Sequence, residues 1–267
     1  LRAEILRKTD KANALIKLIR VELSFAEFSK AESNLLSIKE IQRDVSGFKE
    51  IEEELSFKEK TFSASIALAQ SHLNQLYLTK SEEELDKCLK LCPEASQAKN
   101  FLKEIRDKKE HCEEWKEFFE KKLSEAEFIE AENKLELIKD TWITFPSINK
   151  MGNLLETKKK EFNSAMDGVK QGLEELDPEK VVEWATLALI ICPSSFPASS
   201  QLETSKKVVS ECEELAENIS NFLDEAEFEK VELEVKMLKE KWVNYLELIN
   251  FEEDLDERRT KYEPLMS

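Results

Sequence analysis

The sequence repeats itself at an interval of 100 residues. Residues 23–28 read LSFAEF, residues 123–128 read LSEAEF and residues 223–228 read LDEAEF. The register continues without a gap on both sides of this motif. Within 23–39, six positions are identical in all three copies: Leu23, Ala26, Glu27, Phe28, Glu32 and Lys39, with their partners 100 and 200 residues later. Repetition of this kind predicts one structural unit used several times in a row.

Few residues in the chain are suited to tight turns. The 267 residues include 4 Gly and 6 Pro, while 36% are charged and 41% are hydrophobic. A β-rich or α/β fold needs more turn glycines, and the hydrophobic fraction is too large for a disordered acidic chain. We therefore predict an all-α fold, an elongated helical-repeat array in which long and short helices form antiparallel hairpins, as in an α-solenoid.

The repeat divides the chain into three units. With boundaries at the two Cys-Pro pairs, the helical repeat units cover residues 1–93, 94–193 and 194–267. We expect the first unit to lack its start, because Leu1 aligns with Phe101 inside a predicted helix. The last unit is expected to lack its end for the same reason.

Each copy of the motif has the spacing of a helical capping box. Ser24 is followed three residues later by Glu27, and such a pair can satisfy free backbone N–H groups at the start of a helix. Leu23 and Phe28 occupy the positions of a hydrophobic staple. The equivalent pairs are Ser124 with Glu127 and Asp224 with Glu227. A helix of about 19 residues is therefore predicted to begin at each motif.

Three further helices are expected in each unit. A long one should begin at a capping residue, which is Asp44, Thr144 or Asn244 in the three copies. A short one should begin at Asp177-Pro178, where proline takes the first helical position. A fourth, of about 27 residues, should run from Ala98 or Ala198 to the next motif.

A weaker repeat is visible inside each unit. The spacing of Phe128, Ala131 and Leu135 recurs at Val182, Ala185 and Leu189. This match predicts that each unit consists of two related hairpins, with Val182 in the second hairpin equivalent to Phe128 in the first.

One segment resembles a known repeat family. Trp184–Pro193 carries small residues, with Ala188 five positions before the proline. In this respect the chain resembles tetratricopeptide-type repeats in degenerate form, since its hairpins of about 50 residues exceed that family's 34. The resemblance implies stacked helical hairpins that bind a protein or peptide. Spectrin-type three-helix repeats have a comparable period of about one hundred residues and remain the alternative, although the short helix has no counterpart in three long ones.

Charge and hydropathy narrow the choice of partners. The formal net charge of −17 repels phosphate backbones and anionic lipids, so no nucleic-acid partner is expected. The longest apolar stretch, Val181–Cys192, is shorter than the roughly 20 residues of a membrane helix and predicts a buried helix without membrane insertion. The absence of an apolar leader and the odd number of cysteines favour a reduced, cytoplasmic protein.

The chain offers little material for catalysis. Its two histidines, His72 and His111, have no supporting neighbours in sequence. A metal site at Cys88 and Cys92 would need two further ligands, for which only Cys112 and His111 are candidates. Ala188 replaces Cys88 in the next copy, which indicates a packing position. Acidic runs are typical of a solvated helix face. Core packing is expected for Trp115, Trp142, Trp184 and Trp242 and for Cys88, Cys92, Cys112, Cys192 and Cys212. We predict no catalytic, cofactor-binding or metal-binding residues.

These patterns favour a non-enzymatic scaffold for protein–protein interaction. The alternative is a spectrin-like mechanical spacer, and an enzyme is the weakest interpretation. An exposed apolar or charged patch would favour a scaffold, whereas polar residues on all sides would favour a spacer. We also expect further sequence on both sides or self-association through the ends, because an apolar stripe follows the third motif: Phe251, Leu255, Tyr262 and Met266.

Overall fold

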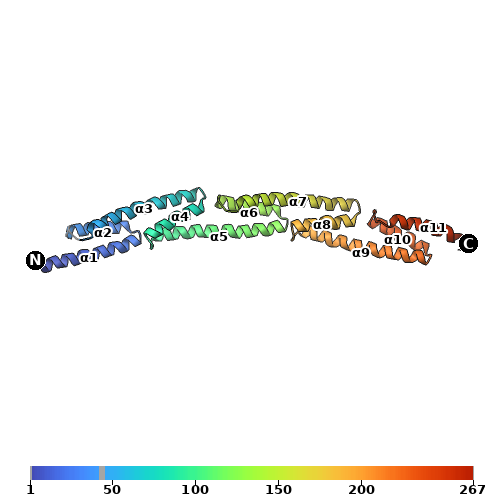
Figure 1. Ribbon diagram of the computed structural model, residues 1–267, viewed down its shortest axis with the longest axis horizontal. Helices are drawn as coiled ribbons and strands as arrows, with labels where there is room; N and C mark the ends of the chain where they lie inside the picture. The colour runs from blue at the N-terminus through green and yellow to red at the C-terminus, as the bar shows by residue number, and fades with distance from the viewer. Residues whose placement is uncertain (1, 42–45, 267) are drawn as a thin grey trace. The chain divides into compact units, whose positions relative to one another are not determined.

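The computed structural model describes residues 2–41 and 46–266 (Figure 1). Eleven α-helices and no strand occur in this part of the chain, so the predicted all-α helical-repeat array is confirmed. The longer helices are α1 (Arg2–Ser24), α3 (Phe48–Asn74), α5 (Ser96–Ser124), α7 (Ile148–Glu174), α9 (Phe196–Asp224) and α11 (Leu248–Met266). The short helices are α2 (Phe28–Ile41), α4 (Leu78–Leu91), α6 (Phe128–Thr141), α8 (Pro178–Ile191) and α10 (Phe228–Lys241).

The chain folds into two compact units. One comprises Leu1–Glu117 and Leu135–Ile148, and the other comprises Phe118–Lys134 and Asn149–Ser267. The bounds of these compact units differ from those of the 100-residue sequence units.

The structural repeat is half as long as the sequence repeat. All five short helices have the same length, 14 residues, and they start at evenly spaced positions: Phe28, Leu78, Phe128, Pro178 and Phe228. The residue equivalent to Phe128 is therefore Pro178, and the prediction of Val182 was wrong. An amphipathic helix matches itself when it is shifted by about one turn of 3.6 residues, so apolar spacing alone does not distinguish the two alignments.

The repeated motif is the turn between two helices, since Ser24 ends α1 and Phe28 begins α2. Ser24 is the last residue of α1, and Ala26 adopts a left-handed conformation with φ of 59°. The Glu27 N–H donates to the Glu22 carbonyl (2.9 Å), and the Ala26 N–H donates to the Leu23 carbonyl (3.2 Å). These two bonds define a Schellman turn, which satisfies carbonyls at the end of a helix. The predicted capping boxes and hydrophobic staples were therefore wrong.

This turn occurs five times among the described residues. Its left-handed residue is Ala26, Leu76, Ala126, Leu176 or Ala226, with φ between 49° and 62°. A residue other than Gly in the left-handed conformation lowers the stability of the fold by about 1 kcal/mol. A short helix begins two positions after each of these residues, and it is shorter than the helix predicted to follow the motif.

The starts of the other helices agree in part with prediction. Asp177 caps α8 as expected, since its carboxylate accepts a hydrogen bond from the Lys180 N–H (3.1 Å) and Pro178 follows it. Thr144 and Asn244 instead lie in turns, four residues before α7 and α11 begin. Asp44 lies outside the described residues.

Three-helix cores form where a short helix packs between two longer ones. Residues at intervals of three and four turn one face of each helix inward. The core of α1, α2 and α3 contains Ala12, Ile16, Ile19, Leu23, Ala31, Leu35, Ile38, Ile51 and Leu55. The core of α9, α10 and α11 contains the residues 200 positions later: Cys212, Ala216, Ile219, Leu223, Val231, Val235, Leu238, Phe251 and Leu255.

The stripe expected to be exposed near the last helix is buried where its side chains are described. Phe251 and Leu255 of α11 pack against α9 and α10. The side chains of Tyr262 and Met266 lie outside the described residues.

Longer helices contribute to two successive cores. Near its start, α9 packs against α8 through Leu202, and residues Cys212–Leu223 of the same helix pack against α10. In the other unit, Ile51 of α3 packs with α1 and α2, while the Ala69 carbonyl accepts a hydrogen bond from Ser81 of α4 (2.7 Å). Successive cores are therefore joined by continuous helix.

Large and small side chains alternate along the repeat. Phe28 packs edge-on against Phe62 with ring centroids 5.6 Å apart, and Phe128 packs in the same way against Phe162 at 5.7 Å. The equivalent positions of the intervening hairpins hold smaller pairs: Leu78 with Cys112, and Pro178 with Cys212. The prediction that the cysteines are core residues is confirmed, because all five are buried.

Candidate functional site

The residues considered for metal binding do not come together. His111 is exposed on α5 and stacks on Trp115 at 6.2 Å, whereas His72 lies at the end of α3, 6.5 Å from the Tyr77 ring. Among the described residues, no group of three or more His, Cys, Asp or Glu side chains is placed to hold a metal ion. Burial raises the pKa of the Cys88 and Cys112 thiols to about 11. Both are therefore neutral near pH 7, as packing residues are.

The tryptophans follow the predicted packing in part. Trp142 and Trp242 are buried, whereas Trp115 and Trp184 are half-buried. Trp184 of α8 lies against α7 at Gly168, where an added Cβ would be 2.3 Å from the indole ring. Because glycine has no side chain, the Trp184 indole can pack directly on the α7 backbone at Gly168.

Helix α8 presents apolar side chains on its outer face. Val181, Ala185 and Ala188 are buried, but Leu187 is 40% exposed and Ile190 is 72% exposed. The Val181–Cys192 stretch is therefore not a fully buried helix, which corrects the prediction. No helix in the described part of the chain has the length and hydropathy to span a membrane. We use "α8 surface" for Val182, Leu187, Ile190, Phe196 and Val209 on α8 and the adjoining α9.

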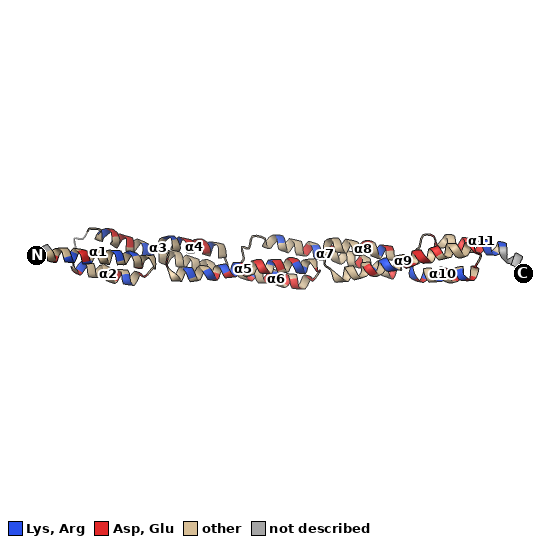
Figure 2. Ribbon diagram, turned by 90° about the horizontal axis from the view of Figure 1, so that it is seen from below, with Lys and Arg blue, Asp and Glu red and all other residues tan. Residues whose placement is uncertain are grey.

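The equivalent surface in the first copy is charged. Lys87 and Lys90 of α4 occupy the positions of Leu187 and Ile190. The position of Phe196, which is 79% exposed, is taken by Ser96. In Figure 2 the ribbon of α8 is largely tan, whereas other helices carry many charged residues.

The contact line between a short helix and the long helix after it, here called the seam, also differs between the two copies. It is charged between α4 and α5 and has two valines between α8 and α9. Between α4 and α5, Glu82 forms ion pairs with Arg106 (3.2 Å) and Lys109. The hydrogen bond from Lys109 is the main cause of a lowered pKa at Glu82, and the bond from Arg106 lowers it further. Between α8 and α9 the matching residues are Val182, Lys206 and Val209, which line a shallow groove of about 350 Å³ with Glu179 and Glu183.

The end of α8 is held in place by a lysine of α7. The Lys158 ammonium donates a hydrogen bond to the Ile191 carbonyl (2.7 Å). At the other end, the side chain of Asp177 caps the helix. The α8 residues of this surface therefore lie on a helix that is anchored at both ends.

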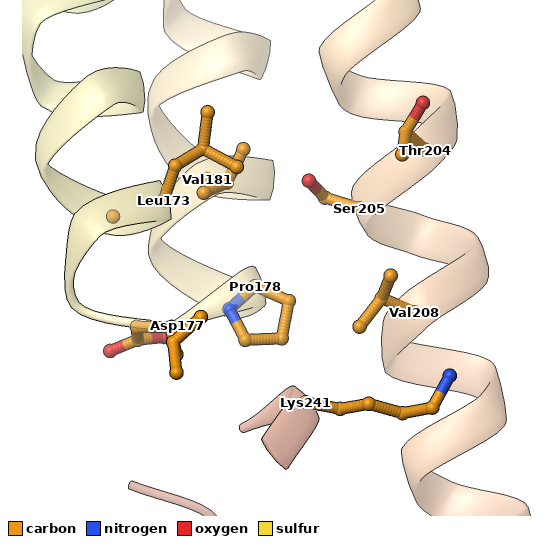
Figure 3. A pocket seen from close by; sticks show the side chains of 10 residues that line it. Leu173, Asp177, Pro178, Val181, Thr204, Ser205, Val208 and Lys241 are labelled. Atoms are coloured by element: carbon orange, nitrogen blue, oxygen red, sulfur yellow. The ribbon is translucent and has the colours of Figure 1, made fainter. Parts of the chain in front are cut away.

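A separate pocket lies where α7 ends and α8 begins (Figure 3). This junction pocket has a volume of about 210 Å³. It is lined by Gly172, Leu173, Leu176, Asp177, Pro178, Val181, Thr204, Ser205, Val208 and Lys241. All of these come from α7, α8, α9, the end of α10 and one turn, so the pocket lies within one compact unit.

The charged groups at the junction pocket already have partners. The Lys241 ammonium lies 2.5 Å from a Glu211 carboxylate oxygen, and that hydrogen bond raises the pKa of Lys241. Asp177 accepts the capping bond and also lies 3.6 Å from the Lys180 ammonium. The surface left to a bound molecule is therefore mainly apolar.

Comparisons with protein-family models, curated proteins and solved structures give no significant match. Neither surface was predicted from the sequence. A signal for the α8 surface was present, however, since alignment of the copies places Leu187 and Ile190 opposite Lys87 and Lys90.

Proposed function

We propose that the chain is a non-enzymatic scaffold for protein–protein interaction and that the α8 surface binds its partner. The proposal rests on one observation, the exposed apolar outer face of α8. Val181, Ala185 and Ala188 are buried against neighbouring helices, whereas the apolar side chains of Leu187 and Ile190 are exposed on the outer face, although apolar helix faces are normally covered. A second protein would complete that burial.

The shape of the surface favours a helix as the bound element. The α8–α9 groove has Val182 and Val209 as apolar members, with Glu183 and Lys206 carrying opposite charges beside them. An amphipathic helix binds such a groove through apolar residues spaced three and four apart, and charges at its edges fix its direction. The partner is thus a protein that presents an amphipathic helix. This mode also fits the tetratricopeptide-like resemblance, which implies peptide binding by helical hairpins.

A photo-crosslinking residue at position 190 tests this proposal. It should capture a protein that the same residue at position 90 does not capture, because α4 has a charged face there. The purified partner should then bind the wild type, and Leu187→Lys with Ile190→Lys should weaken binding at least about 30-fold.

Ile129→Lys is the matched control, since Ile129 is 73% exposed on α6 and lies outside the α8 surface. It should bind the partner normally. Equal crosslinking at positions 90 and 190, or unchanged affinity of the double variant, would refute the proposal.

A mechanical spacer is the second candidate. The observation that favours it is the use of α9 in two successive cores, since a continuous helix through a junction resists bending. A spacer would bind nothing at α8, so the crosslinking experiment also separates these two functions.

A further inference from the structure

The junction pocket results from replacements that remove side-chain volume from one copy of the repeat. Ser205 stands where the first copy has Ile105, and Pro178 stands where it has Leu78. Gly172 replaces His72, although Val181 in place of Ser81 offsets part of that loss, since a Cβ on Gly172 would lie 2.9 Å from Val181. The remaining losses leave space among α7, α8 and α9.

The opening of the pocket has an exposed apolar rim. Leu173 is 47% exposed and Leu176 is 43% exposed, and both line the pocket. In the first copy, the Leu76 carbonyl accepts a hydrogen bond from the Ile143 N–H (3.2 Å), so a turn lies directly against that position. Leu176 both lines the junction pocket and is partly exposed, so the pocket is open to solvent beside it.

The lining defines the kind of molecule that fits. Val181 and Val208 supply methyl groups, and the aliphatic part of Lys241 runs along one side toward α9 (Figure 3). The Lys241 ammonium is engaged by Glu211, so it does not favour an anion inside the pocket. Ser205 is buried on α9, and its hydroxyl points toward α8, where it offers a hydrogen-bonding group within the apolar lining.

We propose that the junction pocket binds a small uncharged apolar molecule with one hydroxyl group, the chemistry of an alkylphenol. A volume of about 210 Å³ suits a single substituted ring, because an apolar cavity of about 150 Å³ accepts benzene. The ring occupies the space between Val181 and Val208, and its hydroxyl bonds to Ser205. This site is distinct from the α8 surface and does not depend on the proposed scaffold function.

The test uses 4-methylphenol, toluene and 4-methylbenzoate as probes in ligand-observed NMR and thermal unfolding. For the wild type we expect saturable binding of 4-methylphenol with a Kd of about 1 mM. The benzoate should bind at least about tenfold more weakly because its charge would lose hydration in an apolar pocket. No saturable binding of either neutral probe would overturn the proposal.

Variants of Ser205 locate the site. Ser205→Ile introduces the side chain of the first copy and should abolish binding of both neutral probes. Ser205→Ala keeps the space, so toluene should bind as before, while 4-methylphenol should lose about fivefold in affinity. Ser210→Ile is the matched control, because Ser210 is exposed on the same helix. Unchanged binding by Ser205→Ile would overturn the proposal.

A direct contact measurement covers the case in which Ser205→Ile does not fold. Nuclear Overhauser effects should connect the ring of 4-methylphenol to the methyl groups of Val181 and Val208 in the wild type. Contacts to other methyl groups alone would overturn the assignment of the site.

Discussion

The helices α4 and α8 occupy equivalent places in the repeat but have opposite surfaces. On α4 and its neighbour α5, Glu82 is held by two cations, and lysines cover the outer face. On α8 and α9, valines occupy the seam, and Leu187 and Ile190 take the lysine positions. The backbone turns at both sites are the same, with Leu76 and Leu176 left-handed. The fold therefore fixes the inner faces of the short helices and leaves their outer faces free to differ.

A large effect should come from the close contact between α7 and α8. Gly168→Ala should lower the free energy of unfolding by about 2 kcal/mol, because the new Cβ would meet the Trp184 ring at 2.3 Å. The equivalent pair on α3 and α4 is Leu68 with Glu84, which needs no such approach. Urea unfolding measures the change.

Gly152→Ala serves as the control on the same helix. Apart from its chain neighbours and the nearby backbone of α7, no described atom lies within 4 Å of the added Cβ. The better helix propensity of Ala should therefore raise stability by about 1 kcal/mol. Destabilisation by both substitutions would show that α7 does not tolerate alanine generally and that Trp184 is not the cause.

The charged seam of the first copy should make its stability depend on pH. The pKa of Glu82 is lowered by Lys109 and Arg106, so its ion pairs stabilise the fold above about pH 4.5 and lose that effect as pH falls through the lowered pKa. Glu82→Gln should cost about 1 kcal/mol at pH 7 and almost nothing near pH 2. Urea unfolding at the two pH values measures this difference.

The exposed Glu83 on the same helix provides a comparison for Glu82. Glu83→Gln should change stability little at either pH. A Glu82→Gln effect that persists unchanged at pH 2 would contradict the role assigned to the charged seam.

The two left-handed leucines should respond differently to glycine. Leu176→Gly should stabilise the protein by somewhat less than about 1 kcal/mol, because Gly removes the left-handed strain while the exposed side chain contributes little packing. Leu76 is half-buried, so Leu76→Gly should gain less or become destabilising. Thermal unfolding of both variants measures the two changes in stability. An equal gain at the two sites would contradict the expectation that burial of Leu76 reduces the benefit of glycine.

The smallest effect is expected on the outer face of α8. Leu187→Lys with Ile190→Lys copies the α4 surface and should change the free energy of unfolding by no more than about 0.5 kcal/mol. Ala188→Lys on the buried face should strongly destabilise the protein, since Ala188 is fully buried. A large loss for the double variant, measured by urea unfolding, would mean that the outer face is structural.

The sequence predicted the repeat, the helical class and the start of α8 at Pro178. It failed at the turns because a Ser-x-x-Glu spacing fits a helix end as well as a start, and because alanine gives no residue signal for a left-handed conformation. The sequence predicted a buried helix and did not predict that Leu187 and Ile190 are exposed, because an apolar run does not reveal which side chains a neighbouring helix covers. The junction pocket depends on Gly172, Pro178 and Ser205, which lie on three helices and meet only in the folded chain.

The sharing of α9 between two cores links their unfolding. If the core with α10 opens, the second half of α9 loses its packing, and a single helix of that length is only marginally stable in water. Fraying can then pass along α9 to the core with α8, as a nearest-neighbour coupling in a one-dimensional chain. Under mechanical load the two cores should therefore yield together, and a core substitution in α10 should increase amide hydrogen exchange in α8.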